Sequence, residues 1–239
     1  EVMGVYAVAF KYVMLLRLPI YGFQTAWGPF AFSIYKQTDA EKTYQKVLLF
    51  YVIILSLAGF LLCITAESAI VFLASSKYSS SYTLVLPLTF ALIIDSISWI
   101  TGLGIGLSKK THYSIFSYCI GIISTIIGIY IGMMFYGIIG VAYGVLFGRI
   151  GLTCATTLFS QRLYYIKYGL FRSSIFMMAT FVLCLLIQKM SILKWYFQTG
   201  LTLASITLLI VILWYFLFSQ EDKEKVGQLV RNILIPRVS

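Results

Sequence analysis

Long apolar runs, separated by short polar segments, make up most of the chain. Crossing the hydrocarbon layer of a bilayer takes about 20 predominantly apolar residues of helix. Several runs reach that length and show no strand-like alternation, so the pattern predicts an all-α integral membrane protein, a polytopic bundle of about seven transmembrane helices. The expected spans are 3–34, 45–64, 82–107, 113–133, 137–160, 171–188 and 196–218.

Two segments do not fit a spanning helix. The stretch ESAIVFLASSKYSSSY (67–82) has an apolar part too short to cross, so we expect a short helix at the membrane surface followed by a serine-rich loop. The chain ends in EDKEKVGQLVRNILIPRVS (221–239), where charged and apolar residues alternate at helical spacing. This pattern predicts that 219–239 is an amphipathic tail lying on the membrane surface.

Composition supports the membrane interpretation and excludes several other classes. Apolar residues make up 60% of the chain, charged residues only 11%, and the mean hydropathy is +0.93, whereas soluble domains carry about 25% charged residues. The net charge of +10 comes mostly from residues in short loops, so we do not expect a nucleic-acid partner. The four cysteines fall in different apolar runs without metal-ligand spacing, and we expect neither a metal nor a cofactor.

Basic residues in the loops predict the orientation. Cytoplasmic loops of membrane proteins are enriched in Lys and Arg. Twelve Lys and Arg fall in one set of alternate connections and the tail, and three fall in the opposite set, Lys77, Lys189 and Lys194. We therefore expect a cytoplasmic C-terminus and a start outside, which favours a fragment whose upstream helices are missing.

A few charged residues lie inside the expected spans. Each costs at least about 2.5–3.5 kcal/mol to insert, so each needs a reason. Arg17, Asp95 and Arg149 lie near the middle of three spans, and Lys11 lies nearer the outer side. Gln24 follows Arg17 by seven residues and shares its helix face. One interpretation is structural, with Asp95 paired to Arg17 or to Arg149 to hold the bundle together.

Pairing alone does not account for three cations facing one acid. The surplus positive charge predicts a water-filled cavity that accepts an anionic group, and phosphate or pyrophosphate suits Arg and Lys best. Because the three charged residues have similar depth on different spans, we expect them to meet in that cavity.

Three stretches resemble a known family. GVYAVAFKYVMLLRLPIYGFQTAWGPFAFSIYK followed by TYQKVLLFYVIIL resembles the eighth and ninth helices of Wzx-like polysaccharide-biosynthesis flippases. LSKKTHYS is similar to the basic cytoplasmic turn after the tenth helix of these proteins, and MMFYGIIGVAYGVLFGRIG to the outer turn that leads into the twelfth. The group belongs to the multidrug/oligosaccharidyl-lipid/polysaccharide exporter superfamily.

The resemblance implies two pseudo-symmetric helical bundles around a central cavity, of which this chain is the C-terminal portion. Such proteins move polyprenyl-pyrophosphate-linked oligosaccharide across the bacterial inner membrane by alternating access, for O-antigen, lipopolysaccharide or capsule synthesis. By position, Arg17, Arg149 and Lys11 would bind the pyrophosphate, and Asp95 and Gln24 would be polar residues of the cavity. The implied partners are the lipid-linked oligosaccharide, membrane lipids and other membrane proteins of polysaccharide assembly.

Two alternatives remain. A drug or metabolite antiporter of the same superfamily would carry acidic cavity residues, and only Asp95 qualifies. A membrane-embedded polymerase or acyltransferase would need catalytic acids or histidines in a large loop, but the longest connection supplies only Glu67. The single histidine, His112, lies beside Lys109 and Lys110, where it fits a topology signal. We therefore expect a transporter and not an enzyme.

Overall fold

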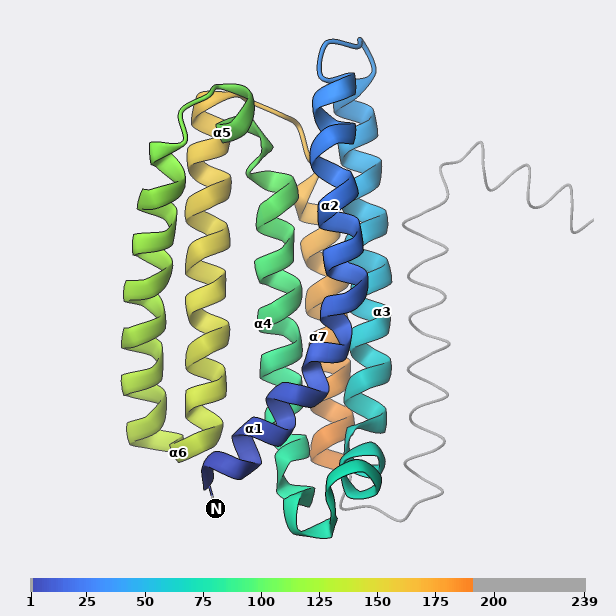
Figure 1. The fold of residues 1–239 in the computed structure, drawn as a ribbon, viewed down its shortest axis with the longest axis vertical. Helices are drawn as coiled ribbons and strands as arrows, with labels where there is room; N and C mark the ends of the chain where they lie inside the picture. The colour runs from blue at the N-terminus through green and yellow to red at the C-terminus, as the bar shows by residue number, and fades with distance from the viewer. Residues whose placement is uncertain (1, 191–239) are drawn as a thin grey trace, which may run out of the picture. The chain divides into compact units, whose positions relative to one another are not determined.

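The computed structural model describes residues 2–190, and that part of the chain is all-helical, without strands (Figure 1). The elements in chain order are α1 (Val2–Val13), η1 (Met14–Leu16), α2 (Arg17–Ile34), α3 (Ala40–Ala74), η2 (Ser76–Ser81), α4 (Tyr82–Thr101), α5 (Leu103–Leu107), α6 (His112–Leu163) and α7 (Leu170–Met190). Two pairs of helices are joined by short 3₁₀ turns, α1 to α2 by η1 and α3 to α4 by η2.

Five helical segments in this part are long and apolar enough to cross a membrane by length and composition. The expected span 3–34 corresponds to α1, η1 and α2 together, and 82–107 to α4 with α5. The expected spans 113–133 and 137–160 are the two arms of α6, and 171–188 is α7. The expected span 196–218 and the tail 219–239 lie outside the described residues.

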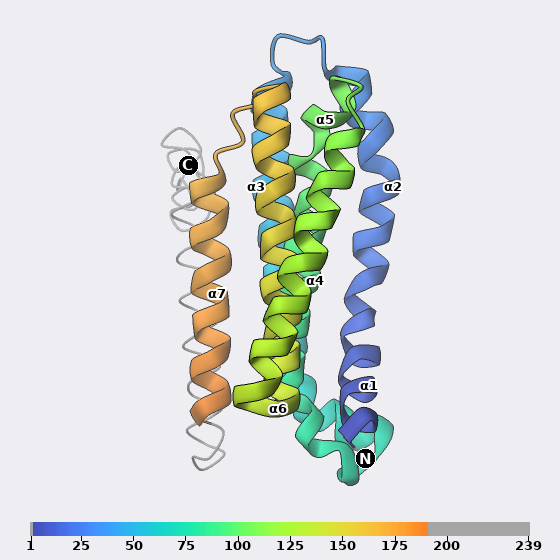
Figure 2. The same cartoon turned by 90° about the vertical axis from the view of Figure 1, so that its left-hand side faces the viewer.

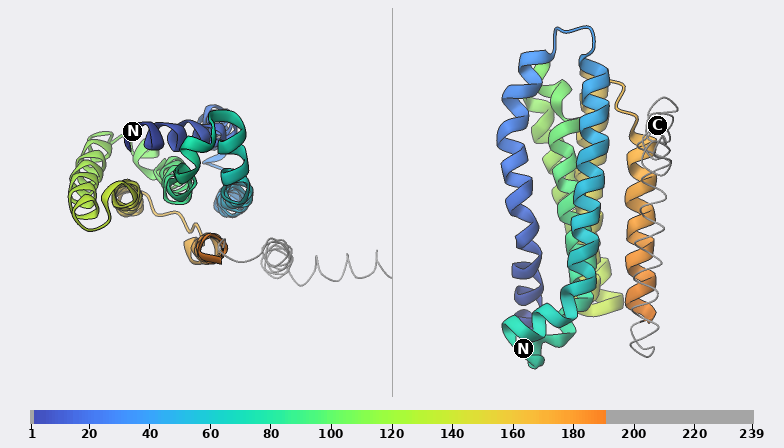
Figure 3. Two further views of the ribbon diagram at one scale, coloured as in Figure 1. Left: turned by 90° about the horizontal axis from the view of Figure 1, so that it is seen from below. Right: turned by 90° about the vertical axis from the view of Figure 1, so that its right-hand side faces the viewer.

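The segment expected to form a separate surface helix continues α3 instead. Helix α3 runs without interruption from Ala40 to Ala74, ten residues beyond the expected end at 64, and stops where Ser75 takes a φ of 112°. The 3₁₀ turn η2 then leads into α4. Viewed from below, the end of α3 and η2 lie across the lower end of the helices (Figure 3).

Helix α6 is a helical hairpin. Gly137 has φ 59° and ψ −135°, a conformation that side-chain-bearing residues rarely adopt, and it reverses the chain between the arms 112–136 and 138–163. The arms lie side by side in Figures 1 and 3. Glycines let them approach closely, because Gly132 faces Gly140 and a Cβ added at Gly128 would lie 2.8 Å from the carbonyl oxygen of Gly144.

The first expected span is broken by η1 just before Arg17, and α1 bends away from the axis of α2 (Figure 1). Pro19 has no N–H to donate to the carbonyl of Leu15, so a regular helix cannot continue through this turn without losing a hydrogen bond. Pro29 is accommodated within α2. The break places Arg17 at the first residue of α2.

Helix α4 lies between α6 and α3 and is buried along most of its length (Figure 1). Helices α1 and α2 lie on one side of this row and α7 on the other (Figures 2 and 3). Tyrosines fix two of the packed segments through buried hydrogen bonds: Tyr44 donates to the carbonyl of Ala31 at 2.8 Å, and Tyr168 to that of Ile100 at 2.9 Å. Burial raises the pKa of Tyr168, which therefore stays a neutral donor.

Candidate functional site

The second arm of α6 meets α4 along a row of polar contacts. Thr153 donates its hydroxyl to the carbonyl of Ile94 at 2.9 Å, and the hydroxyls of Thr157 and Thr101 are 2.9 Å apart. Residues four apart lie on the same face of a helix, so both threonines of α6 point at α4. Hydrogen bonds of this kind hold apolar helices together where hydrophobic burial contributes little. We call this row the α4–α6 polar seam.

The seam ends at the junction of α4 and α5. The backbone N–H of Gly104 donates to the hydroxyl of Ser160 at 3.0 Å, and a Cβ added at Gly104 would lie 2.6 Å from that hydroxyl. A larger residue at Gly104 would therefore push the helices apart. The contact closes the N-terminal turn of α5, whose first N–H groups have no acceptor within their own helix.

The charged member of the seam is an ion pair between two of the predicted site residues. Nη1 of Arg149 donates to Oδ1 of Asp95 at 3.0 Å. The Arg149 side chain is 44% exposed and that of Asp95 29% exposed, so the pair lies at the edge of the packed helices and not in the core. Of the two partners that the sequence allowed for Asp95, the structure has Arg149.

Arg149 also lines a groove between the two arms of α6. The groove has a volume of about 240 Å³, and the polar residues that line it besides Arg149 are Tyr118 and Thr125. The remaining wall is apolar or glycine: Gly121, Ile122, Ile126, Gly148 and Leu152. The guanidinium group therefore lies between this groove and Asp95.

The structure does not bring the other predicted site residues to this pair. Arg17 is exposed, and its Nη1 contacts Sδ of Met14 at 3.9 Å. Lys11 is exposed in the last turn of α1, and Gln24 is half-buried on α2. Within residues 2–190, Arg17 and Lys11 have no acidic partner, and the groove lined by Arg149 includes neither of them.

The seam residues were not singled out from the sequence, although a signal was present. The segment RIGLTCATTLFS (149–160) places Arg149, Thr153, Thr157 and Ser160 three to four residues apart within an apolar run. That spacing marks one polar face of a helix in an apolar setting. Tyr51 belongs to the same region, since its ring is 6% exposed and its hydroxyl is buried near Asp95.

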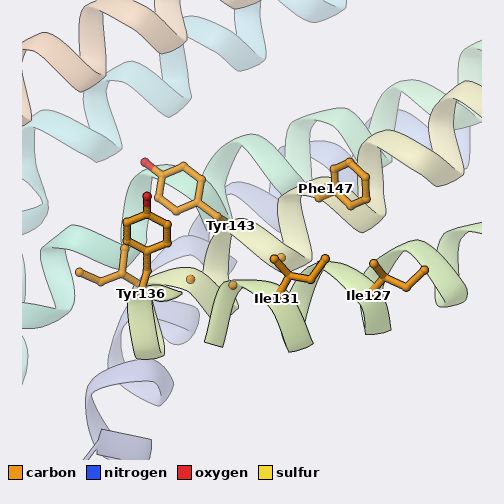
Figure 4. A pocket seen from close by; sticks show the side chains of 10 residues that line it. Ile127, Ile131, Tyr136, Tyr143 and Phe147 are labelled. Atoms are coloured by element: carbon orange, nitrogen blue, oxygen red, sulfur yellow. The ribbon is translucent and has the colours of Figure 1, made fainter. Parts of the chain in front are cut away.

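A second, larger groove follows the hairpin toward Gly137 (Figure 4). It has a volume of about 570 Å³ and no charged residue in its wall. Figure 4 shows Ile127 and Ile131 from the first arm, Phe147 from the second, and Tyr136 and Tyr143 with their hydroxyls pointing the same way. Its chemistry suits a hydrocarbon chain and not an anion.

Among residues 2–190, no group of three or more His, Cys, Asp or Glu is placed to hold a metal ion. Compared with known proteins, the chain matches no family model, no curated protein and no solved structure. Within residues 2–190, fold and site together define an all-helical chain with several helices long and apolar enough to cross a membrane, and with a partly exposed ion pair between two of them.

Proposed function

We propose that the chain is the C-terminal portion of an integral membrane flippase for polyprenyl-pyrophosphate-linked oligosaccharide in the bacterial inner membrane. The observation that carries the proposal is an excess of cations over acids on long apolar helices. Arg17 and Lys11 have no acidic partner in the described part of the chain, and Arg149 uses one donor on Asp95. Charges are retained in such helices when they serve a transported or bound group.

Pyrophosphate is the anion that matches these side chains best. An Arg guanidinium presents five N–H donors in a planar fork, and phosphate oxygens accept from two of them at once. Arg17, at the break between α1 and α2, and Arg149, at the edge of α6, lie apart in this structure, and each would bind the headgroup from its own helix. Lys11, one turn and a half before Arg17, would add a third positive charge on the outer side.

The antiporter alternative receives less support from the same contacts. A carrier of organic cations needs an acidic group that is free to bind its substrate. Asp95 is the one acid in the middle of an expected span, and Arg149 already neutralises it. An embedded polymerase or acyltransferase would need an acid–base pair, and the described residues place no second acid or histidine beside Asp95.

The decisive test measures export and protein abundance together. In the complete protein, we expect Arg17→Ala and Arg149→Ala each to reduce surface polysaccharide at least about tenfold while leaving the protein in the membrane. Lys at either position should retain part of the activity, because a point charge still attracts phosphate without the bidentate geometry. Arg172→Ala removes an exposed basic residue near the start of α7 and serves as the control. Normal export by the Arg17→Ala, Arg149→Ala double variant would refute the proposal.

A further inference from the structure

The ion pair between Asp95 and Arg149 uses only one of the N–H donors of the guanidinium group. Arg–carboxylate pairs are frequently bidentate, with two parallel N–H···O bonds. Here a single bond joins Nη1 to Oδ1 at 3.0 Å, and within residues 2–190 the guanidinium donates to no other acceptor. Arg149 therefore has donors available for a second anionic group while Asp95 holds the first.

The Arg149 side chain is accessible to a second anion from the groove between the arms of α6. Its side chain is 44% exposed, and it lines the 240 Å³ groove between the arms of α6. Tyr118 and Thr125 line the same groove, and because the Thr125 hydroxyl already donates to the carbonyl of Gly121 at 2.7 Å, Tyr118 is the residue that adds a hydroxyl donor suited to a phosphate oxygen. Asp95 does not line the groove, so an entering anion and Asp95 would approach the guanidinium from different positions.

The geometry points to a role for Asp95: we propose that it is a built-in counter-ion that competes with the anionic group of the substrate for Arg149. This inference rests on the proposed function. When the site is empty, Asp95 neutralises Arg149 and lowers the cost of a charge within an apolar helix. When a pyrophosphate binds, carboxylate and phosphate repel each other across the same cation, so Asp95 weakens binding and favours release.

Static support of the helices is the competing account of Asp95. Two uncharged contacts, those of Thr153 and Thr157, already hold α6 to α4, and that of Ser160 holds it to α5. A partly exposed ion pair changes the equilibrium constant for separating two such helices by at most about fivefold, because water screens both charges. The two accounts predict opposite effects of removing the carboxylate on the affinity for an anion.

The proposal is tested by isothermal titration calorimetry. The complete protein in lipid nanodiscs is titrated with inorganic pyrophosphate, and the binding affinity is measured. Asp95→Asn should bind pyrophosphate about five- to tenfold more tightly than the wild type, since the competing charge is gone. Asp95→Glu retains the charge and should stay within about twofold of the wild type. In an Arg149→Gln background, Asp95→Asn should no longer change the affinity.

The outcomes separate this inference from the proposed function. Wild-type binding that Asp95→Asn weakens or leaves unchanged overturns the counter-ion role alone. A wild type that does not bind pyrophosphate, together with normal export by the Arg17→Ala, Arg149→Ala double variant, overturns both. If the Asp95→Asn variant does not fold, infrared difference spectra of the wild type with and without pyrophosphate provide the test instead. Pyrophosphate should then shift a carboxylate band that moves in Asp95→Glu, and an unshifted band contradicts the proposal.

Discussion

Gly144 and Gly128 meet backbone to backbone across the α6 hairpin: a Cβ added at Gly144 would lie 2.5 Å from the carbonyl carbon of Gly128. Neither neighbour is a flexible side chain that could move aside. Gly144→Ala should therefore force the arms apart and destabilise the protein by about 1–3 kcal/mol, the usual effect of overpacking. Thermal unfolding in detergent measures this as a lower Tm.

Gly22→Ala provides the matched control for this prediction. Gly22 is also helical, in α2, but a Cβ there would meet nothing within 4 Å. Alanine favours a helix over glycine by up to about 1 kcal/mol, so the Tm should stay the same or rise slightly. An equal loss of stability in both variants would show that close packing of the arms is not the cause.

Topology gives a prediction that depends only on the loop charges. Cysteines placed at Lys42, Lys110 and Lys167 should react with a membrane-impermeant maleimide only from the cytoplasmic side, and a cysteine at Lys77 only from outside. The four native cysteines must first be replaced, because Cys119 and Cys154 are exposed. Labelling of Lys110→Cys from outside would reverse the orientation of the whole chain.

The long helices within residues 2–190 were predictable from the sequence because each contains a run of apolar residues long enough to span a bilayer. Runs of apolar residues placed the helices, and the glycine-rich segment 137–144 indicated close packing. The ends of the helices were harder to predict from the sequence. Helix α3 extends to Ala74 because nothing in its sequence stops a helix before the positive φ of Ser75, whereas hydropathy indicated an earlier end.

The candidate site was only partly predictable, for a physical reason. Depth along a span follows from counting residues, so Arg17, Asp95 and Arg149 could be assigned similar depths. Which of them meet depends on how the helices are arranged around one another, and apolar surfaces facing lipid leave few sequence signals of that arrangement. The structure pairs Asp95 with Arg149 and leaves Arg17 beside Met14.

Ser160 offers a test of the polar seam. Ser160→Ala removes the acceptor of the Gly104 N–H without adding volume, and Ser160→Thr keeps a hydroxyl. Hydrogen bonds between membrane helices contribute about 0.6 kcal/mol on average and up to about 1.7. We expect the alanine variant to lose stability in that range by reversible unfolding. Ser33, whose hydroxyl donates to the carbonyl of Phe30 in its own helix, should give a smaller loss as Ser33→Ala.

A double-mutant cycle at Asp95 and Arg149 measures how much their pairing contributes to stability. Asp95→Asn leaves the guanidinium without its counter-charge, and Arg149→Gln leaves the carboxylate without its cation. Because both side chains are partly exposed, each single change should cost about 1 kcal/mol, well below the 3–5 kcal/mol of a fully buried pair. The double variant should recover part of this loss, since no charge is left unpaired.

The same cycle with Arg17 in place of Arg149 is the control. Arg17 lies outside the contact with Asp95, so Arg17→Gln and Asp95→Asn should have additive effects on the free energy of unfolding, within about 0.5 kcal/mol. Chemical unfolding in detergent at one pH and ionic strength measures all of these variants. A coupling energy between Asp95 and Arg17 that equalled the coupling to Arg149 would contradict the arrangement of α2, α4 and α6 described above. It would place all three charges in one cavity, as their depth along the sequence first indicated.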